Sequence, residues 1–493
     1  MLAFLFCLCN AMVQAAELSE SLKEVYKSSE ARFYTFNYPS KDAAGEDVVL
    51  SSMLVAWMPR NETDSIEALH IYSHYTITAD NDCPSLRQDL QNHLLFGMLV
   101  QTSHCVVIAP DFEGFGASKD RSHPYLSQEL TARQVMDGVR YGMELYQKLV
   151  ADNLARAFRS DWRSFSWGFS QGGAVALAVH RYIEQNDLSD ELRFRGSICG
   201  DGPYDLLATL HYYMDDDGTS YGTSTGHRKD MITLPMVIPM IIKGMLDTHP
   251  NMQTHTLEDY LSQQFLDTGI MDWLASKQYT TGDISKLWYK QLQNGLTANG
   301  RQYTPQQMSE LFYSPSANNV WARLDKVFTP GFHAYIAGNG TPASRPRLAA
   351  GETSAYRDIH RAMADNSVCE GWEPQHRIQF VHSKGDMVVP YGNYLAFRDS
   401  HPEDEGILYR IDDSPTSTDH TAVGTQFFLT LVTGSYSEYF KWLDESPATG
   451  VQSIEMSVNR GEAVWYDLSG RRLNGRPTSK GIYVFKGKKI AIK

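Results

Sequence analysis

A single serine stands between glycines in the segment Gly168-Phe169-Ser170-Gln171-Gly172, which matches the pattern Gly-x-Ser-x-Gly. The residues before it are typical of a strand, and the residues after it are typical of a helix. Glycines beside a serine permit a strand-to-helix turn so sharp that the hydroxyl stands clear of the backbone. Because Gln171 opens the predicted helix, its N–H could stabilise an oxyanion. The motif predicts a serine nucleophile, whereas a glycine-rich packing turn is the alternative interpretation.

Two residues further along the chain could activate this serine. A serine hydroxyl attacks a carbonyl efficiently only when a histidine accepts its proton and a carboxylate orients that histidine. Asp386 follows the strand-like run RIQFV, and His420 precedes an apolar helix-like run. Asp419 is a rival acid, but its place directly before a predicted helix suits an N-cap. The order of these residues predicts a catalytic triad of Ser170, Asp386 and His420.

The elements that must position these residues alternate along the chain. The pattern predicts short, largely apolar strands and longer amphipathic helices, with the first helices at 125–150 and 172–185. Strands that alternate with helices indicate an α/β fold, in which a mostly parallel sheet carries helices on both faces. The strands expected in this sheet are 68–73, 105–110, 163–169, 194–200, 377–383 and 406–412, with two more extended runs at 33–40 and 47–59.

This alternation stops between Asp205 and about Gly371, where most runs have helical spacing. We expect one helical insertion at about 205–371 within a catalytic domain of residues 16–445; a second independent domain is the alternative. The insertion contains the apolar run 234–246, and we expect its two prolines to interrupt regular helix. Such a run could pack on the sheet domain, or it could line a substrate tunnel above the serine with Met236, Ile238, Met240 and Ile241.

The order of the motifs resembles the α/β-hydrolases grouped with secreted lipases. The resemblance rests on YSHYT and DCPS, CVVIAPDFEGFGASKDRSHPYL, GFSQGG, HSKGDMVVPYG and DHTAVG, and it covers roughly residues 30–445. It implies an α/β-hydrolase fold with a helical lid at the insertion. It also implies that Ser170 is the nucleophile, Asp386 the acid and His420 the base. Family members usually read His-Gly-Thr where this chain has His74-Tyr75-Thr76. We expect Thr76 in this loop to be the second oxyanion donor, beside Gln171.

The two ends of the chain predict export. Residues 1–15 are apolar and uncharged, end in the small-residue pattern Val13-Gln14-Ala15, and are too short to span a bilayer. We expect a signal peptide here, although it lacks the usual basic residue near Met1; a buried N-terminal helix is the alternative. Residues 451–493 resemble the C-terminal sorting modules of bacterial type IX secretion cargo. They imply bacterial secretion machinery as a partner, whereas a small β appendage is the alternative. The expected location is secreted or at the cell surface.

Composition excludes several other functions. The formal net charge is −14, and residues 451–493 are basic, so the main body is more acidic still. This charge argues against nucleic acid as a partner. No CxxC or HExxH pattern occurs, so we expect no metal site, and the predicted chemistry needs no organic cofactor. Four cysteines remain after the signal peptide; they could form two bridges or stay as buried free thiols: Cys83, Cys105, Cys199 and Cys369.

Together these observations predict an exported serine hydrolase that cleaves carboxylic esters through an acyl-enzyme. A lipase or esterase acting on a small-molecule or lipid ester is the first expectation. An esterase that trims acetyl or feruloyl groups from polysaccharide is an alternative with the same chemistry. A serine peptidase of the prolyl-oligopeptidase type shares the triad order, but the region before Asp47 is too short for its usual propeller. A non-catalytic surface-binding protein with a vestigial triad is the alternative from a different class.

Overall fold

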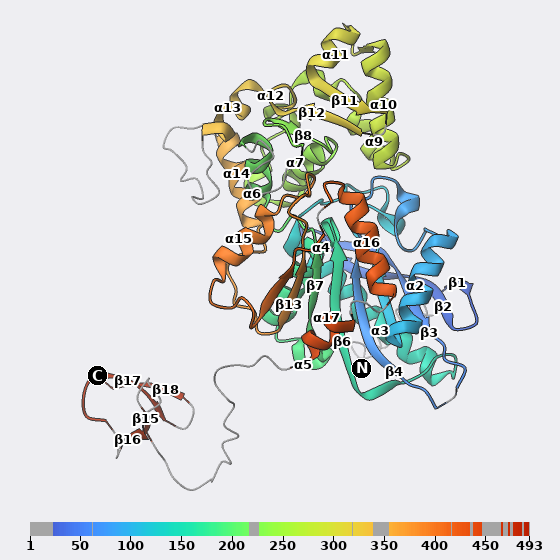
Figure 1. The fold of residues 1–493 in the computed structure, drawn as a ribbon, viewed down its shortest axis with the longest axis vertical. Coiled ribbons are helices and arrows are strands. Elements are labelled where there is room, and N and C mark those ends of the chain that lie inside the picture. The colour runs from blue at the N-terminus through green and yellow to red at the C-terminus, as the bar shows by residue number, and fades with distance from the viewer. Residues whose placement is uncertain are drawn as a thin grey trace, which may run out of the picture. The chain divides into compact units, whose positions relative to one another are not determined.

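A nine-stranded sheet runs through the larger part of the computed structural model (Figure 1). The six strands from β5 to β14 in its order β1-β2-β3-β5-β4-β6-β7-β13-β14 are mutually parallel, and the first three are antiparallel. The mostly parallel sheet expected from the sequence is thus confirmed. The strands are β1 (Lys23–Lys27), β2 (Ala31–Lys41), β3 (Asp47–Trp57), β4 (Ile66–Ser73), β5 (Cys105–Pro110), β6 (Phe158–Phe169), β7 (Phe194–Gly200), β13 (Arg377–Val381) and β14 (Tyr409–Asp412).

The structure describes residues 23–445 except 62, 216–225, 318, 339–353, 416 and 434–436, together with 465–466, 472–473, 477–485 and 488–492. The chain divides into two units, Met1–Ser446 and Pro447–Lys493. The predicted signal peptide, 1–15, lies outside the described residues. A search of those described residues finds no helix that is both long and apolar enough to span a membrane.

Helices cover both faces of the sheet (Figure 1). On one face, Phe428 and Phe440 of two C-terminal helices pack against aromatic rings of β6, among them Trp167. Neighbouring residues of a strand point to opposite faces, so Ser166 of β6 lies on the other face. There it donates a hydrogen bond to the carbonyl oxygen of Ala176 in a covering helix. The first face carries α2 (Leu90–Ser103), α16 (His420–Val432) and α17 (Ser437–Asp444); the second carries α3 (Gln128–Ala151), α4 (Gln171–Gln185) and α15 (Gly392–Ser400), and the short α5 (Ser189–Leu192) precedes β7.

The parallel strands bring distant parts of the chain to one edge of the sheet. Parallel strands end at the same edge, so the residues that follow them gather there. Thr76 follows β4, Ser170 follows β6, and Asp201 follows β7. Asp386 and His420 follow β13 and β14 in the same way. The carboxyl edge of the sheet is therefore where the residues of the predicted site meet.

The insertion between β7 and β13 lies above this edge in Figure 1 and has a hydrophobic core of its own. It consists mainly of helices, as the sequence pattern indicated, and it also contains short strands that the pattern did not indicate. Its helices are α6 (Leu206–Asp215), α7 (Val237–Thr248), α8 (Gln263–Leu266), α9 (Ile270–Ser276), α10 (Thr281–Asn294), α11 (Pro305–Leu311), α12 (Leu324–Val327), α13 (Pro330–Gly338) and α14 (Ser354–Asp365). Its strands are β8 (Met231–Ile232), β11 (Phe312–Ser316) and β12 (Asn319–Arg323) in one sheet, and β9 (Leu296–Ala298) and β10 (Arg301–Tyr303) in a hairpin.

The two prolines of the apolar run 234–246 do not interrupt its helix, contrary to the expectation from the sequence. Pro235 precedes α7, and Pro239 is the third residue of that helix. The first N–H groups of a helix have no acceptor within it, so a proline there removes no hydrogen bond. Helix α7 therefore continues unbroken to Thr248.

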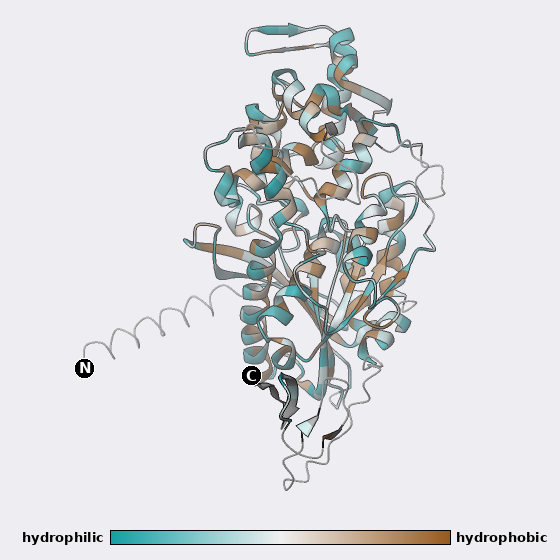
Figure 2. Ribbon diagram, turned by 90° about the vertical axis from the view of Figure 1, so that its left-hand side faces the viewer, coloured by the Kyte–Doolittle hydropathy of each residue, from teal (hydrophilic) through white to brown (hydrophobic). Residues whose placement is uncertain are grey.

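Hydropathy follows this architecture in the larger unit. Figure 2 shows strands of the central sheet that are largely hydrophobic, while the helices that cover them alternate between hydrophobic and hydrophilic residues. All six residues of β5 are buried, as a strand covered on both faces requires. The smaller unit holds an antiparallel sheet of β15 (Trp465–Tyr466), β16 (Arg472–Leu473), β17 (Gly481–Phe485) and β18 (Lys488–Ile492) in the order β16-β15-β17-β18.

Candidate active site

Ser170 lies at the sharp turn between β6 and α4. Its backbone has φ 59° and ψ −127°, a conformation that residues other than glycine adopt only at a cost. The glycines on either side are required because the turn is crowded. A Cβ on Gly168 would lie 2.3 Å from the carbonyl oxygen of Gly172, and a Cβ on Gly172 would lie 2.1 Å from that of Ser73. This turn places Ser170 at the carboxyl edge of the sheet, where it lines a cavity.

His420 and Asp386 are in direct contact. The Nδ1 of His420 hydrogen-bonds to Oδ2 of Asp386. The other oxygen, Oδ1, accepts from the N–H groups of Val388 at 2.7 Å and Val389 at 3.0 Å, and Asp386 is only 1% exposed. Because the carboxylate holds a proton at Nδ1, the Nε2 of the neutral imidazole is left as an acceptor. This Nε2 is buried and has no hydrogen-bond partner within the described part of the chain.

The ring of Phe169 packs against the imidazole of His420. Phe169 directly precedes Ser170, and its ring centroid lies 4.8 Å from that of His420. Helix α16 approaches the same ring so closely that a Cβ on Gly424 would lie 2.7 Å from it. The structure therefore brings the imidazole and its carboxylate to the same end of the sheet as Ser170.

Asp419, the rival acid, has a different partner. Its side chain accepts hydrogen bonds from the N–H groups of Thr421 at 2.9 Å and Ala422 at 3.3 Å. These contacts make it the N-cap of α16, and its side chain is exposed. The carboxylate that contacts the imidazole of His420 is that of Asp386.

Gln171 opens α4 next to Ser170, and its side chain is held by a residue that the sequence did not single out. Its Nε2 lies 3.0 Å from Nε2 of His123, whose Nδ1 contacts the carbonyl oxygen of Glu113 at 2.7 Å. Burial, together with the charge of Lys277, keeps the pKa of His123 well below its usual range. The neutral imidazole therefore donates to Glu113 and accepts from the amide of Gln171.

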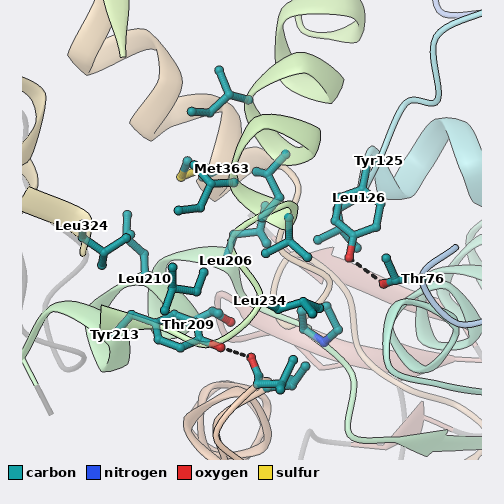
Figure 3. A pocket seen from close by; sticks show the side chains of 18 of the residues that line it. Thr76, Tyr125, Leu126, Leu206, Thr209, Leu210, Tyr213, Leu234, Leu324 and Met363 are labelled. Atoms are coloured by element: carbon teal, nitrogen blue, oxygen red, sulfur yellow. Dashed lines mark hydrogen bonds between the residues drawn. The ribbon is translucent and has the colours of Figure 1, made fainter. Parts of the chain in front are cut away.

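The loop after β4 lies against this turn and holds Thr76. A Cβ on Gly172 would also lie 2.8 Å from the carbonyl oxygen of His74, which shows how closely the loop approaches. The hydroxyl of Thr76 hydrogen-bonds to that of Tyr125 at 2.7 Å, and both residues line the cavity (Figure 3). Tyr75, where the similar family usually has glycine, instead places its hydroxyl against the guanidinium of Arg87.

The cavity at Ser170 extends beneath the insertion and is partly open to solvent (Figure 3). Its polar lining comes mainly from Thr76, Tyr125, Thr209 and Tyr213. The rest is largely hydrocarbon, contributed mostly by α6, α7 and the segments around them: Leu126, Leu206, Leu210, Ile232, Leu234, Val237, Ile238, Ile241, Ile242, Leu324, Phe328, Met363, Val388 and Val389.

Two of the four residues expected to line a substrate tunnel do line this cavity: Ile238 and Ile241. Met236 is fully buried in the core of the insertion, and Met240 lines a second cavity together with Lys243. Neither methionine is among the described residues that line the cavity at Ser170. Residues three and four apart share one face of a helix, so Ile238 and Ile241 of α7 face the cavity that Ser170 lines, and Met240 faces the second cavity. The apolar composition of the run predicted burial, but it could not choose this face.

The four cysteines within the described residues, Cys83, Cys105, Cys199 and Cys369, are buried free thiols. Burial raises the pKa of the Cys105 and Cys199 thiols above its usual range, so both stay protonated at neutral pH. They therefore act as small apolar side chains in the core.

Comparison with known proteins identifies the fold. Neither a family model nor a curated protein sequence matches the chain. Among solved structures, the rice cell wall degrading esterase LipA from Xanthomonas oryzae is similar with a TM-score of 0.61 at 19% identity, over 83% of this chain and 91% of that one. A protein from Legionella pneumophila, provisionally classed as a hydrolase, is similar with a TM-score of 0.58 at 16% identity, over 87% and 94%. The chain has the α/β-hydrolase fold. Candida antarctica lipase A is more distant, with a TM-score of 0.44 at 14% identity over 78% and 71%.

Replacing Asp386 and Asp419, one at a time, by asparagine tests which of the two carboxylates orients the imidazole of His420. Asp386→Asn should lower kcat for a nitrophenyl ester by about 10²-fold or more, because the imidazole loses the partner that fixes its tautomer. Asp419→Asn is the matched control and should stay within about threefold of the parent, since asparagine caps a helix as well as aspartate does. Circular dichroism checks that both variants fold. The reverse order of the two rates would move the acid to Asp419.

Proposed function

We propose that this protein is a serine hydrolase of carboxylic esters, with Ser170, His420 and Asp386 as its catalytic triad. The observation that carries the proposal is the contact between Asp386 and the Nδ1 of His420, which leaves the Nε2 without a hydrogen-bond partner among the described residues, in an imidazole that packs on Phe169, the residue before Ser170. The α/β-hydrolase fold supports it, and so does the description of one structural neighbour, LipA, as an esterase.

The proposed reaction has two halves. The Oγ of Ser170 attacks the acyl carbon while Nε2 of His420 takes its proton; the alcohol then leaves with that proton, and the acyl group stays on the serine. Water attacks the acyl-enzyme with His420 as the base, so that a carboxylic acid leaves and Ser170 regains its proton. Asp386 stabilises the imidazolium in both halves. The N–H groups of Gln171 and Thr76 donate to the oxyanion, and no metal or organic cofactor takes part.

The substrate proposal follows from the lining of the cavity. Hydrocarbon side chains surround most of it, so an acyl chain or aryl group that leaves water for this cavity gains about 0.8 kcal/mol per methylene, roughly fourfold in specificity. We therefore propose small-molecule or lipid esters with an apolar acyl group. An esterase acting on acetyl or feruloyl groups of polysaccharide is the second candidate, supported by the description of LipA as cell wall degrading.

Three further roles belong to this proposal. The insertion serves as a lid, which is supported by its place above the carboxyl edge and by the residues that it contributes to the cavity. Residues 1–15 direct export, and residues 451–493 act as a sorting module for bacterial secretion machinery. The protein would then act outside the cell or at its surface. The apolar uncharged start and the basic β-rich end of the chain support these last two roles.

Replacement of the nucleophile tests the reaction class. Ser170→Ala should lower kcat/KM for nitrophenyl esters by roughly 10³-fold or more, as other triad knockouts do. The parent should react with a fluorophosphonate, should cleave esters rather than peptide amides, and should lose fluorophosphonate labelling in the alanine variant. Circular dichroism should be unchanged, since the hydroxyl contributes little to packing. Ester turnover within tenfold of the parent would remove Ser170 from the mechanism.

The chain-length profile tests the substrate proposal. For the parent, kcat/KM should rise by about tenfold or more from acetyl to hexanoyl esters. Ile241→Gln should flatten this rise and spare acetyl esters, because it puts an amide into the hydrocarbon wall. Met240→Gln is the matched control: it puts the same amide on the other face of α7 and should leave the profile unchanged. A parent that prefers acetyl esters and rejects hexanoyl esters would favour the polysaccharide deacetylase instead.

A further inference from the structure

A second buried carboxyl, that of Asp201, lies beside the proposed acid and base. Asp201 directly follows β7, the strand that lies between β6 and β13 in the sheet. One polar side-chain atom from each of Asp201, Asp386 and His420 lies within 4.8 Å of the other two. Asp201 is 0% exposed, and its Oδ2 has no hydrogen-bond partner among the residues that the structure describes. The proposed mechanism gives this group no task, although unpaired buried carboxyl oxygens are costly.

The chain around Asp201 holds its carboxyl in this place. The backbone has φ 34°, in the left-handed region that aspartate enters more readily than most residues, although still at a cost. Its N–H donates to the carbonyl oxygen of Val381 at 2.9 Å, and its Oδ1 accepts from the N–H of Ser383 at 2.8 Å. Both contacts are with the segment that leads from β13 to Asp386. These two hydrogen bonds hold Asp201 against the loop that carries Asp386, and they leave its Oδ2 without a hydrogen-bond partner among the described residues.

The groups that face Asp201 determine its charge. They are Asp386 after β13, His420 at the start of α16, His382 with its Nε2 at 3.5 Å from Oδ1, and Tyr204 further along its own segment. Burial raises the pKa of Asp201 well above its usual range, and the charge of Asp386 raises it further. Burial lowers the pKa of His382 to about 4, so this imidazole is uncharged at neutral pH. Asp201 therefore stays protonated at neutral pH beside the negative charge of Asp386.

We propose that Asp201 is a second acid of this site: it stays protonated while Asp386 is charged, and it ionises to become the carboxylate partner of His420 when Asp386 is neutral. The inference rests on the proposed triad. Loss of the charge on Asp386 removes one of the two causes that keep Asp201 neutral, and the imidazolium formed during turnover then favours its ionisation. Asp201 acts through His420 and is a positioning residue.

Three variants of this site and one control measure the effect on turnover. Asp201→Asn should stay within about threefold of the parent, because Asp386 remains charged and asparagine still accepts from Ser383. Asp386→Asn combined with Asp201→Asn should fall at least tenfold below Asp386→Asn alone in kcat, because no carboxylate is left beside the imidazole. Asp386→Asn combined with Asp419→Asn is the matched control and should equal Asp386→Asn alone.

A spectroscopic readout separates this inference from the proposed function. A proton on Nδ1 of His420 that is shared with a carboxylate gives a far-downfield proton resonance, which needs no substrate. In Asp386→Asn this resonance should be present above the pH at which Asp201 ionises and should vanish as the pH falls through that ionisation, since only the ionised carboxylate can hold it. In the variant that also carries Asp201→Asn it should be absent at every pH.

Equal kcat values and equal spectra for Asp386→Asn with and without Asp201→Asn would overturn the inference. If the doubly substituted protein does not fold, the pH dependence of the resonance in Asp386→Asn decides, and its absence at every pH at which the protein is folded would overturn the inference. If Ser170→Ala keeps full ester turnover while the spectra follow the expected pattern, the proposed function fails, and only the pairing of Asp201 with His420 in Asp386→Asn is supported.

Discussion

The contact between Nδ1 of His420 and Oδ2 of Asp386 is the interaction on which the proposed chemistry depends. It decides which imidazole nitrogen carries a proton, and so it leaves Nε2 to act as the base. Much of the surrounding structure maintains this contact. Two backbone N–H groups hold the other oxygen of Asp386, the N-cap of α16 fixes the start of the helix that carries His420, and the parallel sheet ends both loops at one edge.

The same edge of the sheet carries strain that the core must offset. Ser170 and Asp201 both have positive φ, and each such residue costs on the order of 1–3 kcal/mol. They follow β6 and β7, adjacent strands in the middle of the sheet, where close packing leaves the backbone no freedom to relax. This rigidity holds Ser170 and Asp201 in their strained backbone conformations at the ends of these two strands.

The sequence predicted the parts of this site that follow from local signals. Ser170, Asp386 and His420 each follow a strand-like run, and their order suits parallel strands that end at one edge. Asp201 also follows such a run, but nothing in the sequence separates it from an ordinary loop aspartate until the sheet order places β7 beside β13. The choice between Ile241 and Met240 depends on how α7 packs, and the two- to five-residue strands of the insertion depend on tertiary pairing rather than on local pattern.

The measurement that tests the central claim most directly is the capture of the covalent intermediate. The protein is mixed with an excess of a nitrophenyl ester, quenched in acid within the first turnovers, digested, and analysed by mass spectrometry. The account predicts an added acyl mass on the peptide that contains Ser170, and this mass should disappear once the ester is exhausted. Continued ester hydrolysis with the acyl group on another residue, or with no acylated peptide under conditions that trap other serine esterases, would contradict the account.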